Sequence, residues 1–357
     1  MSFLESLIHH KQFFSLDIGT TSMKAVEMTR QGETFALKNY AILETFGYLE
    51  RSNNALQTSN LKLLENEVAL YLSLLLKRLN PTSGAAVLSV PTFSTFSTLV
   101  ELPAVQEHEI AKIMQYQAQQ YIPLPIASVT VDWIKVGERV DDSGARKLQI
   151  LLMSIVNDHI EKYRKILQSV GIRMLGVEVE GLSLARALTS GSKEPTLILD
   201  IGGRSTGIFV AQEGFLKFAG QTDFSGGSLT QTISTGLTIS PRRSEDLKRE
   251  RGLLGSGGEQ ELSTLIEPIL DVIIAEGVRV RTNYEKAYQQ TVTRAILSGG
   301  ASNLLGIEEY FTRELGLPTT KADPFKFVTY NQALAPVVKD LGPHLSVAVG
   351  LGMKDLR

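Results

Sequence analysis

Two stretches of the 357-residue sequence repeat one pattern: residues 13–26 read FFSLDIGTTSMKAV, and residues 197–210 read LILDIGGRSTGIFV. In each stretch an apolar run leads into Asp-Ile-Gly, small hydroxyl residues follow, and a second apolar run begins. Apolar runs joined by a turn of Gly, Asp, Ser and Thr are typical of a β-hairpin. Because the two copies lie in opposite halves of the chain, they predict two related lobes rather than a short-period repeat.

Both predicted turns carry groups that can hold a phosphate. Glycine lets backbone N–H groups approach an anion closely, and hydroxyl side chains add donors. A carboxylate in each turn could hold a hydrated Mg²⁺ that bridges phosphate oxygens. Either motif alone could be a plain small-residue turn, but the matching pair predicts a clamp on a phosphate chain. The predicted residues are Asp17, Gly19, Thr20, Thr21, Ser22 and Lys24 in the first turn and Asp200, Gly202, Gly203, Ser205 and Thr206 in the second, with Asp17 and Asp200 holding Mg²⁺ through water.

A third glycine motif, LSGGAS at residues 297–302, follows a short apolar run. Its small residues Gly299, Gly300 and Ala301 leave room for a flat ring against the backbone. Adenine is such a ring. Glycine turns are common, so the motif gains weight only beside the two hairpins.

The rest of the chain mixes strand and helix patterns. We expect strands at 33–43, 85–90, 93–100, 130–136 and 147–156, and helices at 60–79, 107–121, 158–171, 241–251 and 343–353. Asn60 can cap the first of these helices. Residues 254–260 read as a loop. The stretch 259–290 is predicted helical, with breaks at Pro268 and Gly277.

Composition excludes several classes of protein. The formal charge of −2 gives no global field for nucleic acid or anionic lipid. The chain has no cysteine, which rules out disulfides, and its five histidines show no metal-ligand spacing. No secretory signal is visible in the opening MSFLESLIHHKQ, and no apolar run reaches the length of a membrane span. We therefore expect a cytoplasmic protein, which could still meet a membrane through a partner.

The three motifs, in this order, resemble the phosphate-1, phosphate-2 and adenosine motifs of the actin, DnaK-type chaperone and sugar-kinase superfamily. The resemblance implies an α/β, ribonuclease H-like fold of two lobes that enclose ATP and Mg²⁺. It assigns Gly226 and Gly227 to the glycine pair beside the nucleotide, and Glu245 and Lys248 to the helix that flanks ribose and base. A solvated helix face is the alternative for Glu245 and Lys248. Arg204 departs from the pattern, which usually has glycine there.

Four further stretches are similar to the PilM family of type IV pilus assembly proteins. They are VPTFSTFSTLVELP at 90–103, QQYIPLP at 119–125, the run at 158–188 that ends in VEVEGLSLARAL, and GLPTTKADPFKFV at 316–328. The family resemblance implies an FtsA-type inserted αβ subdomain at residues 86–170. It places residues 1–85, 171–194 and 335–357 in the first lobe and residues 195–334 in the second, with 240–290 as a smaller subdomain.

The resemblance also implies partners. Members of the family bind the short cytoplasmic N-terminal peptide of the membrane protein PilN, in a groove between the inserted subdomain and the first lobe. Phe93, Phe96 and Leu99 lie near such a groove by sequence, although apolar residues of this kind are more often core. Other pilus inner-membrane and motor components, and self-association, are expected as well.

Two alternatives stay open. An FtsA-like scaffold would carry an amphipathic membrane helix after a linker, which the closing residues GLGMKDLR do not provide. A small-molecule kinase of the superfamily would need a catalytic carboxylate, and Asp223 and Asp323 are acidic residues outside any kinase-like motif. We expect a nucleotide-dependent scaffold with slow ATP hydrolysis at most and no identified catalytic residue.

Overall fold

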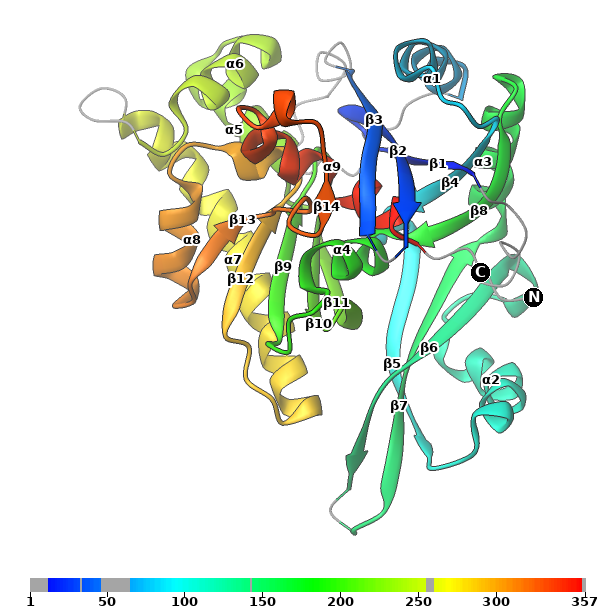
Figure 1. Ribbon diagram of the computed structural model, residues 1–357. Helices are drawn as coiled ribbons and strands as arrows, with labels where there is room; N and C mark the ends of the chain where they lie inside the picture. Colours follow the sequence, from blue (N-terminus) through cyan, green and yellow to red (C-terminus); the bar gives the residue numbers. More distant parts are fainter. Residues whose placement is uncertain (1–11, 33, 46–64, 142, 255–259, 355–357) are drawn as a thin grey trace.

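The computed structural model describes residues 12–32, 34–45, 65–141, 143–254 and 260–354. The described residues form three sheets, of which two face each other across the molecule (Figure 1). The predicted cap at Asn60, the loop at 255–259 and the opening segment fall outside these ranges. None of the helices in the described ranges combines the length and apolar character that crossing a membrane requires.

The first sheet has six strands in the order β14-β3-β2-β1-β4-β8. Their bounds are β1 Phe14–Ile18, β2 Ser22–Gln31, β3 Thr34–Glu44, β4 Ala85–Val90, β8 Arg173–Val179 and β14 Val328–Thr329. The central strand β1 is buried along its whole length, since β2 and β4 pair with its two edges and helix α9 (Val338–Gly352) packs on it. The helices α1 (Glu65–Leu79), α3 (Asn157–Ser169) and α4 (Glu180–Thr189) pack around this sheet.

The second sheet has five strands in the order β11-β10-β9-β12-β13. Their bounds are β9 Thr196–Ile201, β10 Thr206–Gln212, β11 Phe215–Thr222, β12 Arg294–Ser298 and β13 Thr319–Lys321. The helices of this lobe are α5 Gly226–Leu237, α6 Pro241–Arg251, α7 Gln260–Tyr288 and α8 Ile307–Leu315. Both predicted hairpins are confirmed, since β1 pairs with β2 and β9 pairs with β10 in antiparallel register.

The third sheet, β5-β7-β6, projects away from the first (Figure 1). A 3₁₀ turn at Thr92–Ser94 leads into β5 (Thr95–Pro103), and α2 (Glu107–Tyr121), the 3₁₀ turn Ile126–Ser128, β6 (Val129–Val140) and β7 (Arg146–Val156) follow. We call residues 92–156 the small sheet unit. Its core is separate and centres on Val100, Met114 and Leu152.

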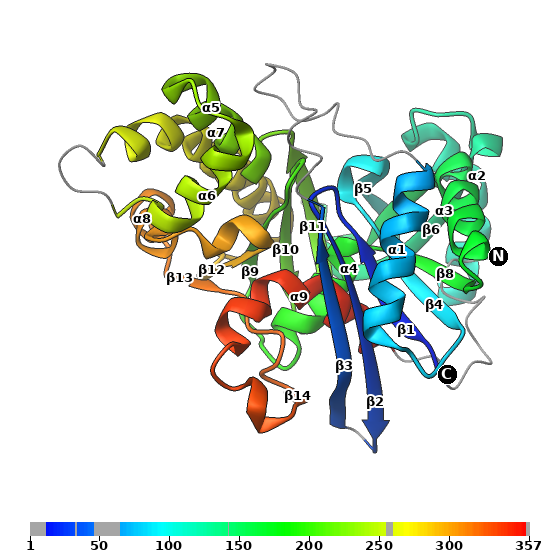
Figure 2. The ribbon, with the colours of Figure 1, turned by 90° about the horizontal axis from the view of Figure 1, so that it is seen from above.

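Helix α9 (Val338–Gly352) lies between the two large sheets (Figure 2). Its carboxyl half packs on β1, β2 and α4 of the first lobe, and its amino half reaches β12 and the turn at Gly300–Asn303 in the second lobe. The sequence prediction began this helix at residue 343. Pro343 in fact lies inside it, where it lacks an N–H group but uses its carbonyl to accept from Gly299 N at 3.0 Å.

The predicted breaks in the long helix of the second lobe are wrong. Helix α7 runs unbroken from residue 260 to 288 through Pro268 and Gly277. Its buried face, which includes Ile266, Leu270 and Ile273, belongs to the core of the second lobe, and this packing outweighs the local cost of proline. A Cβ on Gly277 would lie 3.3 Å from Leu199, so glycine here permits close packing on β9.

Candidate functional site

A cavity of about 390 Å³ lies where the turns of the two hairpins face each other. Its wall contains nearly all of the residues that the sequence proposed. From that set it includes Asp17, Gly19, Thr20, Thr21, Ser22, Lys24, Asp200, Gly202, Gly203, Ser205, Gly226, Gly227, Glu245, Lys248, Gly299, Gly300 and Ala301. Thr206 is the exception, because its hydroxyl is turned away and donates to Phe224 O at 2.7 Å.

The two hairpin turns have the same internal hydrogen bond. Gly19 N donates to Ser22 O at 3.0 Å, and Gly202 N donates to Ser205 O at 3.1 Å. The turns touch each other, because a Cβ on Gly203 would lie 2.5 Å from Thr21 Oγ1. Within the described residues, the backbone N–H groups of Thr20 and Thr21 have no acceptor. Such N–H groups are what an anion in the cavity needs.

Asp17, next to the end of β1, lies in the cavity wall, and both its carboxylate oxygens accept hydrogen bonds. Ser89 Oγ donates to Oδ1 at 2.7 Å, and Lys24 Nζ donates to Oδ2 at 3.0 Å. Burial is the largest effect on Lys24 and lowers its pKa, but Asp17, Asp200 and Glu180 outweigh burial and raise the pKa overall. Lys24 is therefore a fixed positive charge beneath the first turn, facing the cavity and not solvent.

Two further carboxyl groups, Asp200 and Glu180, meet Asp17 at the floor of the cavity. Burial raises the pKa of Asp200, and the nearby Asp17 raises it further against the hydrogen bond from Ser298. Burial and the charge of Asp200 raise the pKa of Glu180. Even with Glu180 protonated, the carboxylates of Asp17 and Asp200 beside one lysine leave a local excess of negative charge, which a bound cation would relieve.

Glu180 was not among the predicted site residues. It begins α4, and its Oε1 accepts from Thr92 N at 3.0 Å and from Thr92 Oγ1 at 2.9 Å. The available signal was a lone glutamate after an apolar strand. That signal is too common to identify a site.

The glycine pair at the start of α5 supports the second turn. Gly226 N donates to Gly202 O at 2.9 Å, and Gly227 N donates to Gly203 O at 3.2 Å. A Cβ on Gly226 would lie 2.9 Å from Ala301 Cβ, so glycine is needed for this close contact. These two N–H groups therefore hold the turn in place and are not offered to a ligand.

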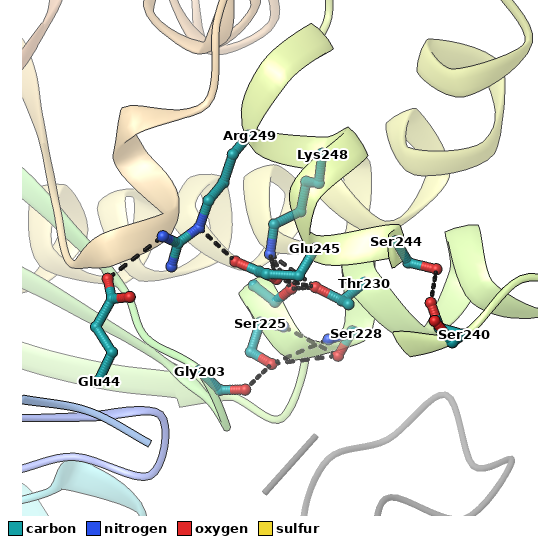
Figure 3. A network of polar contacts seen from close by, with 11 residues as sticks. Glu44, Gly203, Ser225, Ser228, Thr230, Ser240, Ser244, Glu245, Lys248 and Arg249 are labelled. Atoms are coloured by element: carbon teal, nitrogen blue, oxygen red, sulfur yellow. Dashed lines mark hydrogen bonds and ion pairs between the residues drawn. The ribbon is translucent and has the colours of Figure 1, made fainter. Parts of the chain in front are cut away.

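Helix α6 supplies a charged network at the edge of the cavity (Figure 3). Ser240 caps the helix and Pro241 follows at its first position, which agrees with the predicted start at residue 241. Lys248 Nζ donates to Glu245 Oε2 at 2.6 Å, to Thr230 Oγ1 at 2.7 Å and to Gly226 O at 2.9 Å. Although burial opposes it, the charge of Lys248 lowers the pKa of Glu245 to about 2. Both side chains are buried, which rules out the solvated helix face.

Arg249 continues this network across the cleft. Its Nε donates to Glu245 Oε1 at 2.9 Å, and its Nη1 donates to Glu44 Oε1 at 3.3 Å (Figure 3). Glu44 ends β3 in the first lobe, so this ion pair joins the two lobes at the cavity. The sequence had no means of pairing residues so far apart in the chain.

The third glycine motif forms the remaining wall. Gly299 has a φ of +83°, which favours glycine, and a Cβ on it would lie 2.5 Å from Ile201 O. Both the backbone conformation and the available space therefore require glycine at this position. Beside it, Gly300 lies against the imidazole of His344, whose buried Nδ1 has no hydrogen-bond partner in the described part of the chain. Burial lowers the pKa of His344 to about 4, so this ring is neutral near pH 7.

The wall suits a nucleotide with an indirectly held cation. In the described ranges no cluster of three or more His, Asp or Glu side chains could ligate a metal directly. Asp17 and Asp200 face the cavity from opposite lobes, and carboxylates in this arrangement hold a hydrated Mg²⁺ through its waters. The free turn N–H groups and Lys24 fit phosphate oxygens, and the glycine wall fits a flat ring.

Comparison with known proteins gives a consistent family. The sequence model of the family described as "Type IV pilus assembly protein PilM" matches residues 15–356. Cell division protein FtsA of Bacillus subtilis (strain 168) is 25% identical over 251 residues, which cover 66% of this chain and 54% of FtsA. The chain thus spans about half the length of this curated relative.

Solved structures share the fold at low sequence identity. The PilM-PilN type IV pilus biogenesis complex contains a chain with a TM-score of 0.80 and 19% identity, covering 97% of this chain and 99% of that one. MreB5 of Spiroplasma citri bound to ADP has a TM-score of 0.54 and 13% identity, covering 95% and 94%. The expected actin-like, two-lobed fold is confirmed.

Proposed function

The chain belongs to the family of type IV pilus assembly proteins PilM, and from that premise we propose that it is an ATP-binding scaffold of pilus assembly. The observation that carries the proposal is the pair of matching turns, one from each lobe, that face each other across one cavity. A ligand held by both turns would join the lobes. Its presence would then favour one lobe arrangement over another.

In this proposal each part of the wall has a role toward ATP. The turn N–H groups, the hydroxyls of Thr20 to Ser22 and Lys24 bind phosphate oxygens. Asp17 and Asp200 hold Mg²⁺ through water, which neutralises phosphate charge when bound. The glycine wall at Gly299 to Ala301 and the α6 residues Glu245 and Lys248 flank the nucleoside. Structures of MreB5 with ADP and with AMPPNP, which share this fold, support a nucleotide as the ligand.

The same geometry argues for slow hydrolysis at most. A base that activates water must be ionised near neutral pH. Burial and Asp200 raise the pKa of Glu180, so Glu180 holds its proton more tightly than an ordinary carboxyl group. Asp200, with a pKa of about 6, is ionised near pH 7, but in this proposal Asp17 and Asp200 are both engaged by the hydrated Mg²⁺. We therefore propose a switch and not a metabolic enzyme, and this distinguishes it from a small-molecule kinase.

For the partner, we propose the cytoplasmic N-terminal peptide of a PilN protein. The PilM-PilN complex has the same fold over nearly its whole length, and this supports the choice. We propose that the small sheet unit forms the centre of the inserted subdomain expected at residues 86–170. Within those bounds, β4 and α3 pack with the first sheet, and β14, expected in the second lobe at 195–334, also pairs in the first sheet. A cytoplasmic location at the inner membrane through PilN, and contacts with motor components, belong to the same proposal.

Two measurements on the purified full chain test the function. Calorimetry with ATP, with and without Mg²⁺, should detect binding that strengthens with Mg²⁺. A synthetic peptide from the N-terminal tail of the PilN encoded in the same genome should bind, and its affinity should change when Mg·ATP is present. If the peptide does not bind with or without Mg·ATP, the PilN partner is excluded, and an FtsA-like scaffold becomes the better interpretation.

A further inference from the structure

Arg204, the residue that departs from the superfamily pattern, lies over an aromatic ring. Its guanidinium carbon is 3.8 Å from the centroid of the Phe93 ring. Arg204 belongs to the second-lobe turn between β9 and β10, and Phe93 belongs to the 3₁₀ turn that opens the small sheet unit. Both side chains line the cavity. The contact therefore joins the phosphate-facing turn of one lobe to the small sheet unit, within the nucleotide cleft.

The neighbouring residue is tied to the cleft as well. Thr92 donates through both its N–H and its hydroxyl to Glu180 Oε1. Glu180 lies on the cavity floor, where burial raises its pKa and the charges of Asp200 and Asp17 raise it further. Thr92 thus makes two hydrogen bonds with Glu180 at the start of α4, and Phe93 makes one contact with Arg204 in the β9–β10 turn.

The opening turn is rigidly connected to the sheet that follows it. At the end of the 3₁₀ turn, Thr95 N donates to Thr92 O, and Thr95 is also the first residue of β5. The strand then pairs with β7 in regular register from Thr95 opposite Ile155 to Pro103 opposite Lys147. Because the turn that contains Phe93 leads directly into β5, a displacement of Phe93 would also displace the first residues of that strand.

We propose that the Arg204–Phe93 contact communicates phosphate occupancy of the cleft to the small sheet unit. This inference rests on the proposed nucleotide function. A guanidinium over an aromatic face gains about 0.5–2 kcal/mol, whereas charge-assisted hydrogen bonds from arginine to phosphate are stronger and bidentate. Phosphate in the cleft competes with Phe93 for Arg204. Arg204 then leaves the ring, and the start of β5 loosens.

The test measures hydrogen exchange in the full chain at the backbone amides of segment 92–103, in which Pro103 has none, together with the emission of Trp133. Trp133 is the only tryptophan of the chain, and it packs on the core of the small sheet unit. Each protein is measured free and with Mg·ATP at about twenty times its own Kd. The variants are Phe93→Leu, which keeps an apolar side chain without a π face, Arg204→Gln, and both together.

The matched control is Phe35→Leu. Arg30 lies over the Phe35 ring at 5.6 Å, but Phe35 does not line the cavity. In the wild type and in the control, Mg·ATP should raise exchange at 92–103 at least about threefold, a free-energy change of about 0.65 kcal/mol. In Phe93→Leu and Arg204→Gln, exchange should already be raised without nucleotide and change little on its addition. The double variant should behave as either single variant does.

Two results would overturn the coupling. One is a nucleotide response of wild-type size in Phe93→Leu, and the other is wild-type binding by calorimetry with no change at 92–103. The second result would leave the nucleotide function intact. Absence of any nucleotide binding by the wild type would remove the proposed function and this coupling together.

Discussion

Thr21 lies directly against the Cα of Gly203, so that a Cβ on Gly203 would be 2.5 Å from Thr21 Oγ1. The two residues belong to turns in different lobes, and no side chain separates the turns at this point. The two phosphate-facing turns can therefore approach this closely only because Gly203 has no Cβ. Any change of the distance between the turns should affect a ligand that both turns hold.

Gly203→Ala should weaken the binding of Mg·ATP at least about tenfold, or about 1.4 kcal/mol, because the added methyl group pushes the turns apart. Calorimetry measures the effect. Gly84→Ala is the control, since a Cβ there meets nothing within 4 Å. Unchanged affinity in Gly203→Ala, with Gly84→Ala also unchanged, would mean that a ligand does not contact both turns.

The site could be predicted largely because it is built from local turns. Asp-Ile-Gly after an apolar strand determines both the hairpin and the carboxylate position, as at Asp17 and Asp200. Glu180, Arg249 and His344 could not be found in this way. Each acquires its role from a partner that is distant in sequence, such as Thr92 for Glu180 and Glu44 for Arg249.

The same distinction explains the errors in the fold. The predicted bounds of α2 (107–121) and α6 (241–251) match the observed ones, because the signals that set them lie in or next to the helix ends. The predicted breaks in α7 failed because the packing of its apolar face on the second sheet is not visible locally. Strand β8 was missed for a related reason, since its pairing with β4 crosses the whole small sheet unit.

Asp17→Asn and Asp200→Asn should each weaken the binding of Mg·ATP about tenfold or more. Each substitution removes a negative charge that would hold Mg²⁺ through water, so the gain in affinity on adding Mg²⁺ should shrink as well. The exposed Asp246→Asn on α6 serves as the control. Full retention of the Mg²⁺ effect in both variants would exclude the two carboxylates from the metal site.

The stability of Glu180→Gln should differ from that of the wild type in a pH-dependent way. Burial and Asp200 raise the pKa of Glu180 from 4.5 to about 8. As pH rises through this window the unfolded chain releases the proton before the folded one does, so Glu180 makes the wild type progressively less stable. Glutamine keeps an oxygen acceptor for Thr92 but cannot ionise, and it avoids this loss.

The Tm of Glu180→Gln should therefore exceed that of the wild type by about 2 °C or more at pH 8, and by less at pH 5. His344, whose lowered pKa gives the opposite slope below its ordinary value of 6.5, is present in both proteins and cancels in the difference. The exposed Glu250→Gln should show no such trend. An equal difference at both pH values would contradict the raised pKa.

The ion pair between Arg249 and Glu44 should contribute to ligand binding as well as to folding, because it joins the two lobes at the cavity. Both side chains are partly exposed, so the pair itself stabilises the protein by about 0.2–1 kcal/mol at most. A double-mutant cycle with Arg249→Ala and Glu44→Ala should show a coupling of that size in Mg·ATP affinity, which disappears at about 1 M salt. The Arg139–Glu101 pair within the small sheet unit is the control, and its removal should leave nucleotide affinity unaltered.

Lys217 anchors the small sheet unit to the second lobe at a point away from the cleft. Its Nζ donates to Val136 O on β6, while Tyr288 OH donates to Lys217 O at 2.9 Å. Burial lowers the pKa of Lys217, because removing the ammonium group from water disfavours its charged form, and this opposes folding. Lys217→Met removes that unfavourable effect and the hydrogen bond together, so global stability should change by less than about 1 kcal/mol.

The local effect of Lys217→Met should be larger than its global one. Hydrogen exchange at residues 129–140 should accelerate at least about fivefold, because β6 loses its hydrogen bond to β11. The response of residues 92–103 to Mg·ATP should persist, because Thr92 and Phe93 still join the unit to the cleft. Lys193→Met on the surface should change neither quantity. Unaltered exchange at 129–140 would show that the unit is held to the second lobe by apolar packing and not by Lys217.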